Sequence, residues 1–326
     1  MEEKRQAADG SGQARRTLVT GAAGFVGRWL VPRLLERGDE VVGVRLPEEH
    51  DAPEGPRWIA ADLGDAQLTT SILNDVRPDC IVHLAAVSFP PDAERDPMEA
   101  LRVNYGAVDA LLEGMARFCP RARLLYVGTG IAYGARAPDA PPYDEKDPLR
   151  PDNLYAASKA AAEQRCTLAT ERNGLDVVRA RPLNHSGPGR PPQYVESSIA
   201  RQLVRIERGE QPAVLRVGNL DPIRDFSDVR DVVAAYELLL DRGEAGGVYN
   251  VCSGRGYSIR ELLDRLVALS NAQPQVEQDD ALYRPAPRER LALVGNPGRV
   301  RSLGWEPRYS LDATLRDLLE DWRSRG

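Results

Sequence analysis

The 326-residue sequence lacks the features that would place the chain in a membrane or around a metal. No stretch approaches the ~20 apolar residues that span a bilayer, and the polar residues 1–16 have no apolar core like that of a secretory signal. We therefore expect a cytoplasmic protein with no membrane contact. Only three histidines and four cysteines occur, and none is spaced with another like metal ligands. We expect no metal, and reduced, buried thiols.

Excess positive charge is also missing. The formal net charge is −6, so there is no general attraction of the kind that holds a protein on a nucleic-acid backbone or an anionic membrane. We expect no nucleic-acid partner. Any anionic ligand must then be met by local arginines.

What the sequence does contain is an alternation of short apolar runs and helical segments. The runs are TLVT, EVVGV, WIAAD, CIVHLAA, RLLYVG and LDVVRARPL, and apolar residues recur at helical spacing between them. This order predicts an α/β fold with a doubly wound, parallel, Rossmann-type sheet covered by helices on both faces. Helices are expected at 98–118 and 154–172, and Pro32 predicts a kink in the first helix.

From about Arg181 the pattern changes. Pro and Gly cluster at 181–192, and helical patterns then dominate. We expect a disordered tail at 1–16, a dinucleotide-binding domain at 17–181, and a smaller, mostly helical substrate lobe at 182–326, with some exchange of strands between the two.

Gly21, Gly24 and Gly27 lie between the first strand and the first helix. There, one glycine permits the turn, one lets backbone approach a pyrophosphate and one packs helix on strand, while the helix N-terminus faces the anion. Arg45 ends the second strand, where a protein that prefers NAD carries an acid for the ribose hydroxyls. A guanidinium pairs instead with a 2′-phosphate, so NADP(H) is favoured over NAD(H). Asp62 is a candidate acceptor for the adenine amino group.

The segment YAASK places Tyr155 and Lys159 on one helix face, and Thr129 ends the strand in YVGTG. A phenol is a poor acid-base catalyst at neutral pH, but we expect the nearby ammonium and an oxidised nicotinamide to lower the pKa of Tyr155. The Thr129 hydroxyl could reach the same substrate oxygen.

Together, TGAAGFVG, HLAA, GTGIAYG, YAASK, RPLNHSGPG and RDFSDVRDVV resemble the extended short-chain dehydrogenase/reductase family, in its nucleotide-sugar branch. The resemblance runs from about Thr17 to the C-terminus and is greatest to GDP-mannose 4,6-dehydratases and GDP-4-keto-6-deoxy-mannose reductases. In the dehydratases a carboxylate two residues after the catalytic Ser or Thr moves the protons. Here that residue is Ile131, whose side chain can neither take nor give a proton, so reduction is favoured over dehydration.

The resemblance implies an NAD(P)H-dependent reduction of a 4-keto-6-deoxy sugar on a nucleotide diphosphate, with GDP the favoured nucleotide. Tyr155 would protonate the substrate oxygen, Thr129 would hold it, and Lys159 would anchor the nicotinamide ribose. It also implies a homodimer packed through the helices of Asn104 and Tyr155, with Asn104 holding a water or backbone group behind the site.

The expected binding residues form two sets. For the cofactor they are Gly21, Gly24, Phe25, Val26, Gly27, Arg45, Asp62, Leu63, Leu84, Ala85, Ala86, Tyr155 and Lys159. For the substrate they are Ser88, Thr129, Gly130, Asn184, Val195, Arg201, Val217, Arg224 and Arg284. Of these, the resemblance assigns the diphosphate to Arg224 and Arg284, a role that suits arginine because its planar guanidinium meets phosphate oxygens in pairs.

Two alternatives stay open. A nucleotide-sugar epimerase would return the hydride to the opposite face, and such enzymes generally retain NAD and a ribose-binding acid, which Arg45 replaces. A redox-sensing NADP-binding protein without catalysis would typically lack the Tyr155–Lys159 pair. Net consumption of NADPH separates a reductase from an epimerase.

Overall fold

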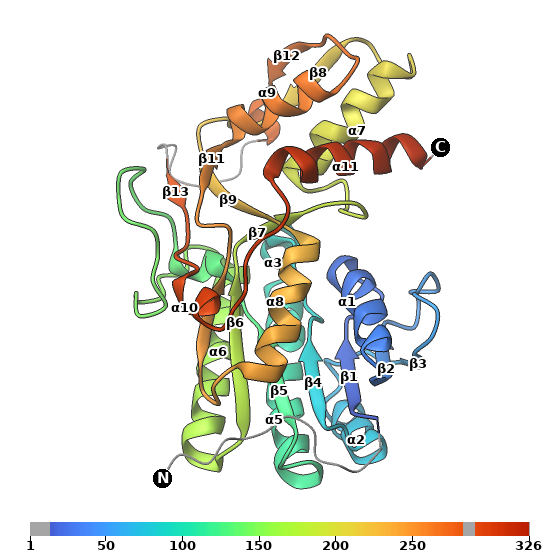
Figure 1. Ribbon diagram of the computed structural model, residues 1–326, viewed down its shortest axis with the longest axis vertical. Helices are drawn as coiled ribbons and strands as arrows, with labels where there is room; N and C mark the ends of the chain where they lie inside the picture. Colours follow the sequence, from blue (N-terminus) through green and yellow to red (C-terminus); the bar gives the residue numbers. More distant parts are fainter. Residues whose placement is uncertain (1–13, 283–290, 326) are drawn as a thin grey trace.

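The computed structural model describes residues 14–282 and 291–325, and its centre is one parallel sheet (Figure 1). Seven strands pair in the order β10-β6-β5-β4-β1-β2-β3. They are β1 (Arg16–Thr20), β2 (Glu40–Arg45), β3 (Arg57–Ala60), β4 (Cys80–His83), β5 (Arg123–Val127), β6 (Asp176–Pro182) and β10 (Val248–Val251). The strand order reverses between β1 and β4, which opens a crevice at the carboxyl ends of the strands. The expected Rossmann-type sheet is confirmed.

Helices cover both faces of this sheet. On one face α2 (Ala66–Val76), α5 (Ala107–Phe118) and α6 (Leu154–Asn173) share a buried core with the strands, and on the other α1 (Phe25–Glu36) and α8 (Val229–Arg242) do the same. Burial on both faces explains why the strands are continuous apolar runs. Pro32, where a kink is expected, lies inside α1, which is one helix from Phe25 to Glu36.

The helix expected at 98–118 consists of three parts: α4 (Pro97–Leu101), a π-helical turn η1 (Arg102–Gly106), and α5. The turn carries Asn104, which is fully buried. Its side-chain oxygen accepts a hydrogen bond from the Val87 amide at 2.8 Å. Its side-chain nitrogen donates to the Val87 carbonyl at 3.2 Å and to Ser158 Oγ at 2.9 Å. Asn104 therefore ties the loop after β4 to the helix that carries Tyr155.

The second lobe contains helices around a core of their own, together with two small sheets that the sequence pattern did not predict. Its helices are α7 (Val195–Glu207), α9 (Ile259–Leu269) and α11 (Leu311–Ser324). The sheets comprise β7 (Asn184–Ser186), β9 (Ile223–Asp228), β11 (Gly256–Ser258) and β13 (Ala292–Leu293), and separately β8 (Val214–Val217) with β12 (Gln275–Gln278). Short helical segments complete the fold: α3 (Pro90–Arg95), η2 (Gly130–Tyr133), η3 (Asp280–Leu282) and α10 (Gly298–Ser302).

The chain passes between the main sheet and the second lobe more than once. Residues beyond 181 supply β10 and α8 to the main sheet layer. At the other end, Arg16 already begins β1 and Arg15 pairs with Asp39 and Asp241, so the ordered fold starts earlier than the expected tail of 1–16 allowed. The rest of that tail, residues 1–13, lies outside the described residues.

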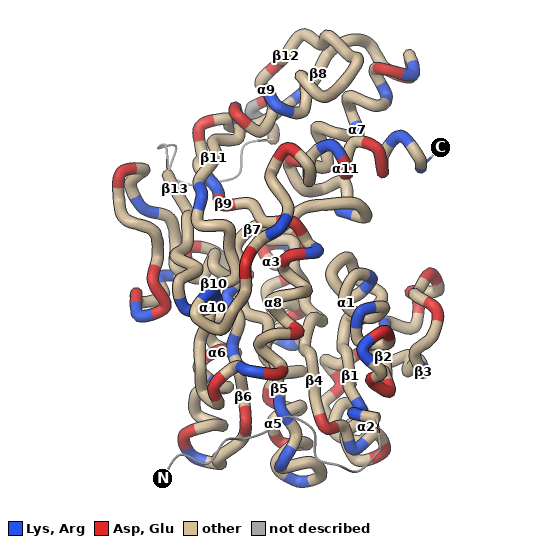
Figure 2. Tube along the Cα trace, in the orientation of Figure 1, with Lys and Arg blue, Asp and Glu red and all other residues tan. Residues whose placement is uncertain are grey.

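Charged side chains of both signs are interspersed along the chain (Figure 2). Among residues 14–282 and 291–325, no helix is long and apolar enough to cross a bilayer. In the same part of the chain, no cluster of His, Cys, Asp or Glu has the arrangement of a metal site. The four cysteines are free thiols, all of them buried.

Candidate active site

A cleft of about 1760 Å³ opens at the carboxyl ends of the parallel strands and extends to the second lobe. It brings together nearly all the residues expected from the sequence: Gly21, Gly24, Phe25, Val26, Gly27, Arg45, Asp62, Leu63, Leu84, Ala85, Ala86, Ser88, Thr129, Tyr155, Lys159, Asn184, Val195, Val217 and Arg224. Segments far apart in the sequence therefore share one cavity.

Two of the expected substrate residues do not line this cleft, and a third lies outside the described residues. Gly130 faces Leu183, whose Cδ1 would lie 2.6 Å from a Cβ at that position. Arg201 is exposed on α7, with its guanidinium carbon 5.9 Å from the Trp322 ring, and it does not line the cleft. Arg284 lies outside the described residues.

The glycine turn after β1 forms the floor of the cleft. Gly21 has a φ of +63°, and a Cβ there would lie 2.8 Å from the backbone nitrogen of Ala85, so the turns after β1 and β4 touch. Gly24 is the N-cap of α1, and neither a capping side chain nor an acidic residue occupies the first turn. The first amides of α1 are thus open to the cleft, an arrangement that fits the pyrophosphate of a dinucleotide.

The loop after β2 lines the end of the cleft where the adenosine of the cofactor is expected. Arg45 donates from Nη1 to the backbone carbonyls of Leu46 and Glu49, so it is held at the cleft edge by the chain itself. Asp62 accepts from Arg102 at 2.8 Å, and this hydrogen bond lowers the pKa of the Asp62 carboxyl. A guanidinium and a carboxylate with a lowered pKa therefore line the part of the cleft where a 2′-phosphate and an adenine are expected.

Tyr155, Thr129 and Lys159 lie together at the other end of the cleft. Tyr155 is in the first turn of α6, which Asn153 caps by accepting from the Ala156 amide, and Thr129 is the N-cap of η2. All three side chains are buried, with exposed fractions of 8%, 5% and 3% for Tyr155, Thr129 and Lys159. Thr129 lies close enough to Tyr155 to act on the pKa of its hydroxyl, so the two hydroxyl groups can address one substrate oxygen.

The expected lowering of the Tyr155 pKa depends on the charge of an oxidised nicotinamide and stays a prediction. In the protein alone, burial raises the pKa of Tyr155 to about 12, and this outweighs the opposing effects of Thr129 and of the Arg190 charge. Lys159 is itself desolvated, and burial lowers its pKa to about 8 against the opposing effects of Cys166 and Glu163. The phenol is therefore a proton donor at neutral pH, and its neighbour Lys159 is still mostly charged.

His83 lies behind this group rather than in it. Its ring is fully buried, with Nδ1 2.8 Å from the Thr20 hydroxyl, and it does not line the cleft. Burial and the nearby charge of Lys159 lower the pKa of His83 to about 3. His83 therefore stays neutral and supports the carboxyl end of β4.

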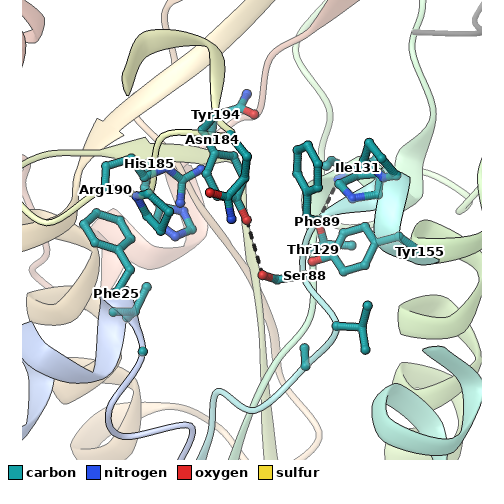
Figure 3. Close-up of a pocket in the computed structure, with 18 of the residues that line it drawn as sticks. Phe25, Ser88, Phe89, Thr129, Ile131, Tyr155, Asn184, His185, Arg190 and Tyr194 are labelled. Carbon is teal, nitrogen blue, oxygen red and sulfur yellow. Dashed lines mark hydrogen bonds between the residues drawn. The ribbon is translucent and has the colours of Figure 1, made fainter. Parts of the chain in front are cut away.

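The wall opposite Tyr155 contains residues that sequence reasoning did not assign, notably Arg190 and Tyr194 (Figure 3). The Arg190 guanidinium carbon lies 3.4 Å from the centre of the Tyr194 ring, and Nε donates to Glu196 at 3.1 Å. Nearby, His185 stacks on Phe25 of the glycine turn with ring centres 6.0 Å apart. Burial lowers the pKa of His185 to about 4, so Arg190 is the cation of this wall.

The sequence profile of the family described as GDP-mannose 4,6 dehydratase matches residues 18–318. The chain belongs to this GDP-mannose 4,6-dehydratase family. It is thus a nucleotide-sugar enzyme of the extended short-chain dehydrogenase/reductase type, as the motifs predicted.

Similar members of this group are reductases and epimerases. The chain is 38% identical over 312 residues to GDP-6-deoxy-D-mannose reductase of Pseudomonas aeruginosa, covering 95% of this chain and 98% of that protein. A solved structure of RMD from P. aeruginosa complexed with NADPH matches with a TM-score of 0.84 and 36% identity over 96% of this chain and all (100%) of that chain. The UDP-glucose 4-epimerase of Thermus thermophilus in complex with NAD matches with a TM-score of 0.85 and 29% identity, covering 95% of this chain and 100% of that one.

One position of this GDP-mannose 4,6-dehydratase family member bears directly on dehydration. Ile131 lines the cleft and packs beside Tyr155 in an apolar cluster with Val87, Ala93 and Ala100. A hydrocarbon side chain there can neither remove a proton from the sugar nor protonate a leaving hydroxyl. The site retains the groups for hydride transfer to a carbonyl.

Proposed function

We propose that this protein is an NADPH-dependent reductase of a nucleotide-diphosphate 4-keto-6-deoxy sugar of the GDP-4-keto-6-deoxy-mannose type. The observation that carries this proposal is the buried group of Tyr155, Thr129 and Lys159 at the cleft, with Ile131 where dehydration would need a carboxylate. The similarity to the P. aeruginosa reductase supports the same reading.

NADPH supplies the hydride when it is bound. On the side of the protein, the hydroxyls of Thr129 and Tyr155 hold the keto oxygen, and Tyr155 gives its proton to that oxygen as negative charge develops. A pKa of about 12 keeps the phenol protonated until then, and the Lys159 ammonium stabilises the phenolate that is left. Burial of all three side chains strengthens these interactions by excluding water.

The direct test is to mix the protein with NADPH and a GDP-4-keto-6-deoxy-mannose and to follow both compounds. We expect one NADPH to be oxidised for each sugar reduced, measured by the loss of NADPH absorbance and by chromatography of the nucleotide sugar. Turnover of a nucleotide sugar without net oxidation of NADPH would identify an epimerase instead, the activity of several relatives of similar fold.

Arg45 is the residue we propose to select NADPH. Replacing Arg45 with Leu is expected to weaken NADPH binding about tenfold, because a charge-assisted contact to a phosphate contributes roughly 1.5 kcal/mol or more. NADH binding should be unchanged, since NADH has no 2′-phosphate, and it serves as the control in the same fluorescence titration. Equal weakening of both cofactors would show that Arg45 only shapes the loop.

For the substrate, we propose that Arg224 meets the diphosphate and that Val195 and Val217 lie along the nucleoside. Arg224 lines the cleft beside Asn184, and its Nη1 donates to the carbonyls of Ile223 and Leu291, which fixes the guanidinium at the cleft surface. GDP is the proposed nucleotide. Arg284 stays a further proposal for the same role.

We also propose a cytoplasmic homodimer. Apolar side chains are exposed on helices that pack together, with Met98 74% and Leu101 44% exposed on α4 and Leu154 40% exposed on α6. A second copy covering these side chains would remove them from water. The cytoplasmic location is supported by the four buried cysteines, which form no disulfide, as is usual in a reducing compartment. Sedimentation at micromolar concentration tests the dimer.

A further inference from the structure

Two hydroxyl groups meet across the cleft beside the proposed reaction centre. Ser88 Oγ and the Tyr194 hydroxyl are 3.2 Å apart, and both residues line the cleft (Figure 3). Ser88 comes from the loop between β4 and α3, whereas Tyr194 is the N-cap residue of α7. Their hydrogen bond therefore connects the main sheet layer with the second lobe.

The Tyr194 ring is held from two sides. The Arg190 guanidinium lies over one face at 3.4 Å, and the Phe89 ring meets it edge-on with ring centres 5.6 Å apart. Arg190 is in turn fixed by a buried ion pair with Glu196, in which the side chains are only 10% and 3% exposed. The hydroxyl therefore has one definite position without relying on Ser88.

The position of this pair points to the sugar rather than to the phosphates. Ser88 and Tyr194 line the same part of the cleft as Thr129 and Tyr155 (Figure 3). Each hydroxyl carries one donor and two acceptor positions, so the bond between Ser88 and Tyr194 leaves one hydrogen and several lone pairs for a ligand. Neutral groups of this kind suit the hydroxyls of a sugar ring, while the anionic diphosphate needs cations such as Arg224.

We propose that Tyr194 and Ser88 form a clamp that binds a ring hydroxyl of the hexose from both sides of the cleft. This proposal rests on the proposed function and adds Tyr194 as a residue that recognises the sugar. When a sugar binds, its hydroxyl bonds to both residues through the hydrogen and the lone pairs that their mutual bond leaves free. The clamp therefore distinguishes a nucleotide sugar from the nucleotide diphosphate alone.

The test compares GDP with GDP-mannose by calorimetric titration in the presence of NADP⁺. The wild-type protein is expected to bind GDP-mannose more tightly than GDP. Tyr194→Phe should weaken GDP-mannose binding about fivefold, the value of one hydrogen bond, and leave GDP binding unchanged. In turnover the same variant should raise KM by a similar factor with little change in kcat. Tyr309→Phe, which removes a hydroxyl away from the cleft, is the matched control.

Ser88→Ala provides a second route, because the clamp needs both hydroxyls. It should weaken GDP-mannose binding to a similar extent, and the double variant should lose less than the sum of the two single effects. If Tyr194→Phe lowers the melting temperature of the protein, binding to the Ser88→Ala variant still tests the clamp. The clamp is overturned if both variants keep the wild-type preference for GDP-mannose over GDP. It is also overturned if they lose the same affinity for GDP and for GDP-mannose. Either result leaves the reductase proposal standing. Absence of binding by any nucleotide diphosphate would overturn both.

Discussion

Tyr155→Phe is expected to lower kcat about a thousandfold, because it removes the proton donor and keeps the ring. The phenol is the protonated group at the centre of the site, with its pKa raised to about 12 by burial. Without its proton the developing alkoxide is stabilised only by Thr129. The measurement is the single-turnover rate of NADPH oxidation with a saturating keto-sugar.

Cofactor binding provides the control for this variant. NADPH affinity should remain close to that of the wild type, since the ring still fills its place and Lys159 is retained. Tyr257→Phe, on β11 and away from the cleft lining, should keep full activity. A Tyr155→Phe protein that turns over at the wild-type rate would show that another group, or water, donates the proton.

Glu163→Leu is expected to lower the free energy of unfolding by about 3 kcal/mol, because it leaves a buried arginine without its counter-charge. Arg181 Nη2 lies 2.6 Å from Glu163 Oε1, and the two side chains are only 7% and 5% exposed. Arg181 keeps its hydrogen bonds to the Tyr133 hydroxyl and the Glu145 carbonyl, which limits the loss. The change in the free energy of unfolding is measured by urea unfolding monitored by circular dichroism.

An exposed ion pair supplies the comparison. Glu244 accepts from Arg299 at 2.9 Å with side chains 72% and 39% exposed, and Glu244→Leu should change the unfolding free energy by less than about 1 kcal/mol. Adding Arg181→Met to Glu163→Leu should recover part of the stability, because it removes the unpaired charge. If Glu163→Leu and Glu244→Leu cost the same, the buried pair does not stabilise the fold as argued.

The fold was predictable from the sequence because its central strands are buried on both faces. Such strands read as uninterrupted apolar runs, as in CIVH of β4, and their alternation with helices leaves few topologies. The glycine turn was equally predictable. Gly21 adopts a positive φ and lies against the turn after β4, where a side chain would not fit. The strands outside the main sheet carry many polar residues, as in IRDFSD of β9 and QVEQ of β12, so they did not stand out as apolar runs.

The site was predictable only in part. Helix periodicity would have placed Arg201 correctly, because Ile199 and Leu203 face the core and Arg201 falls on the outer side of α7. Arg190 and Tyr194 could not be found in this way, since they follow β7 in a segment without regular structure. The raised pKa of Tyr155 in the protein alone could not be predicted, because motif spacing reveals a neighbouring charge but not the extent of burial.

The last strand of the main sheet comes late in the chain. β10 pairs with β6 through Val248–Val251, which are translated only after α7, β8 and β9 of the second lobe. Until those residues leave the ribosome, the nascent protein presents β6 as an open edge that could pair with another chain. Co-translational folding of this protein should therefore depend on protection of that edge, for example by a chaperone.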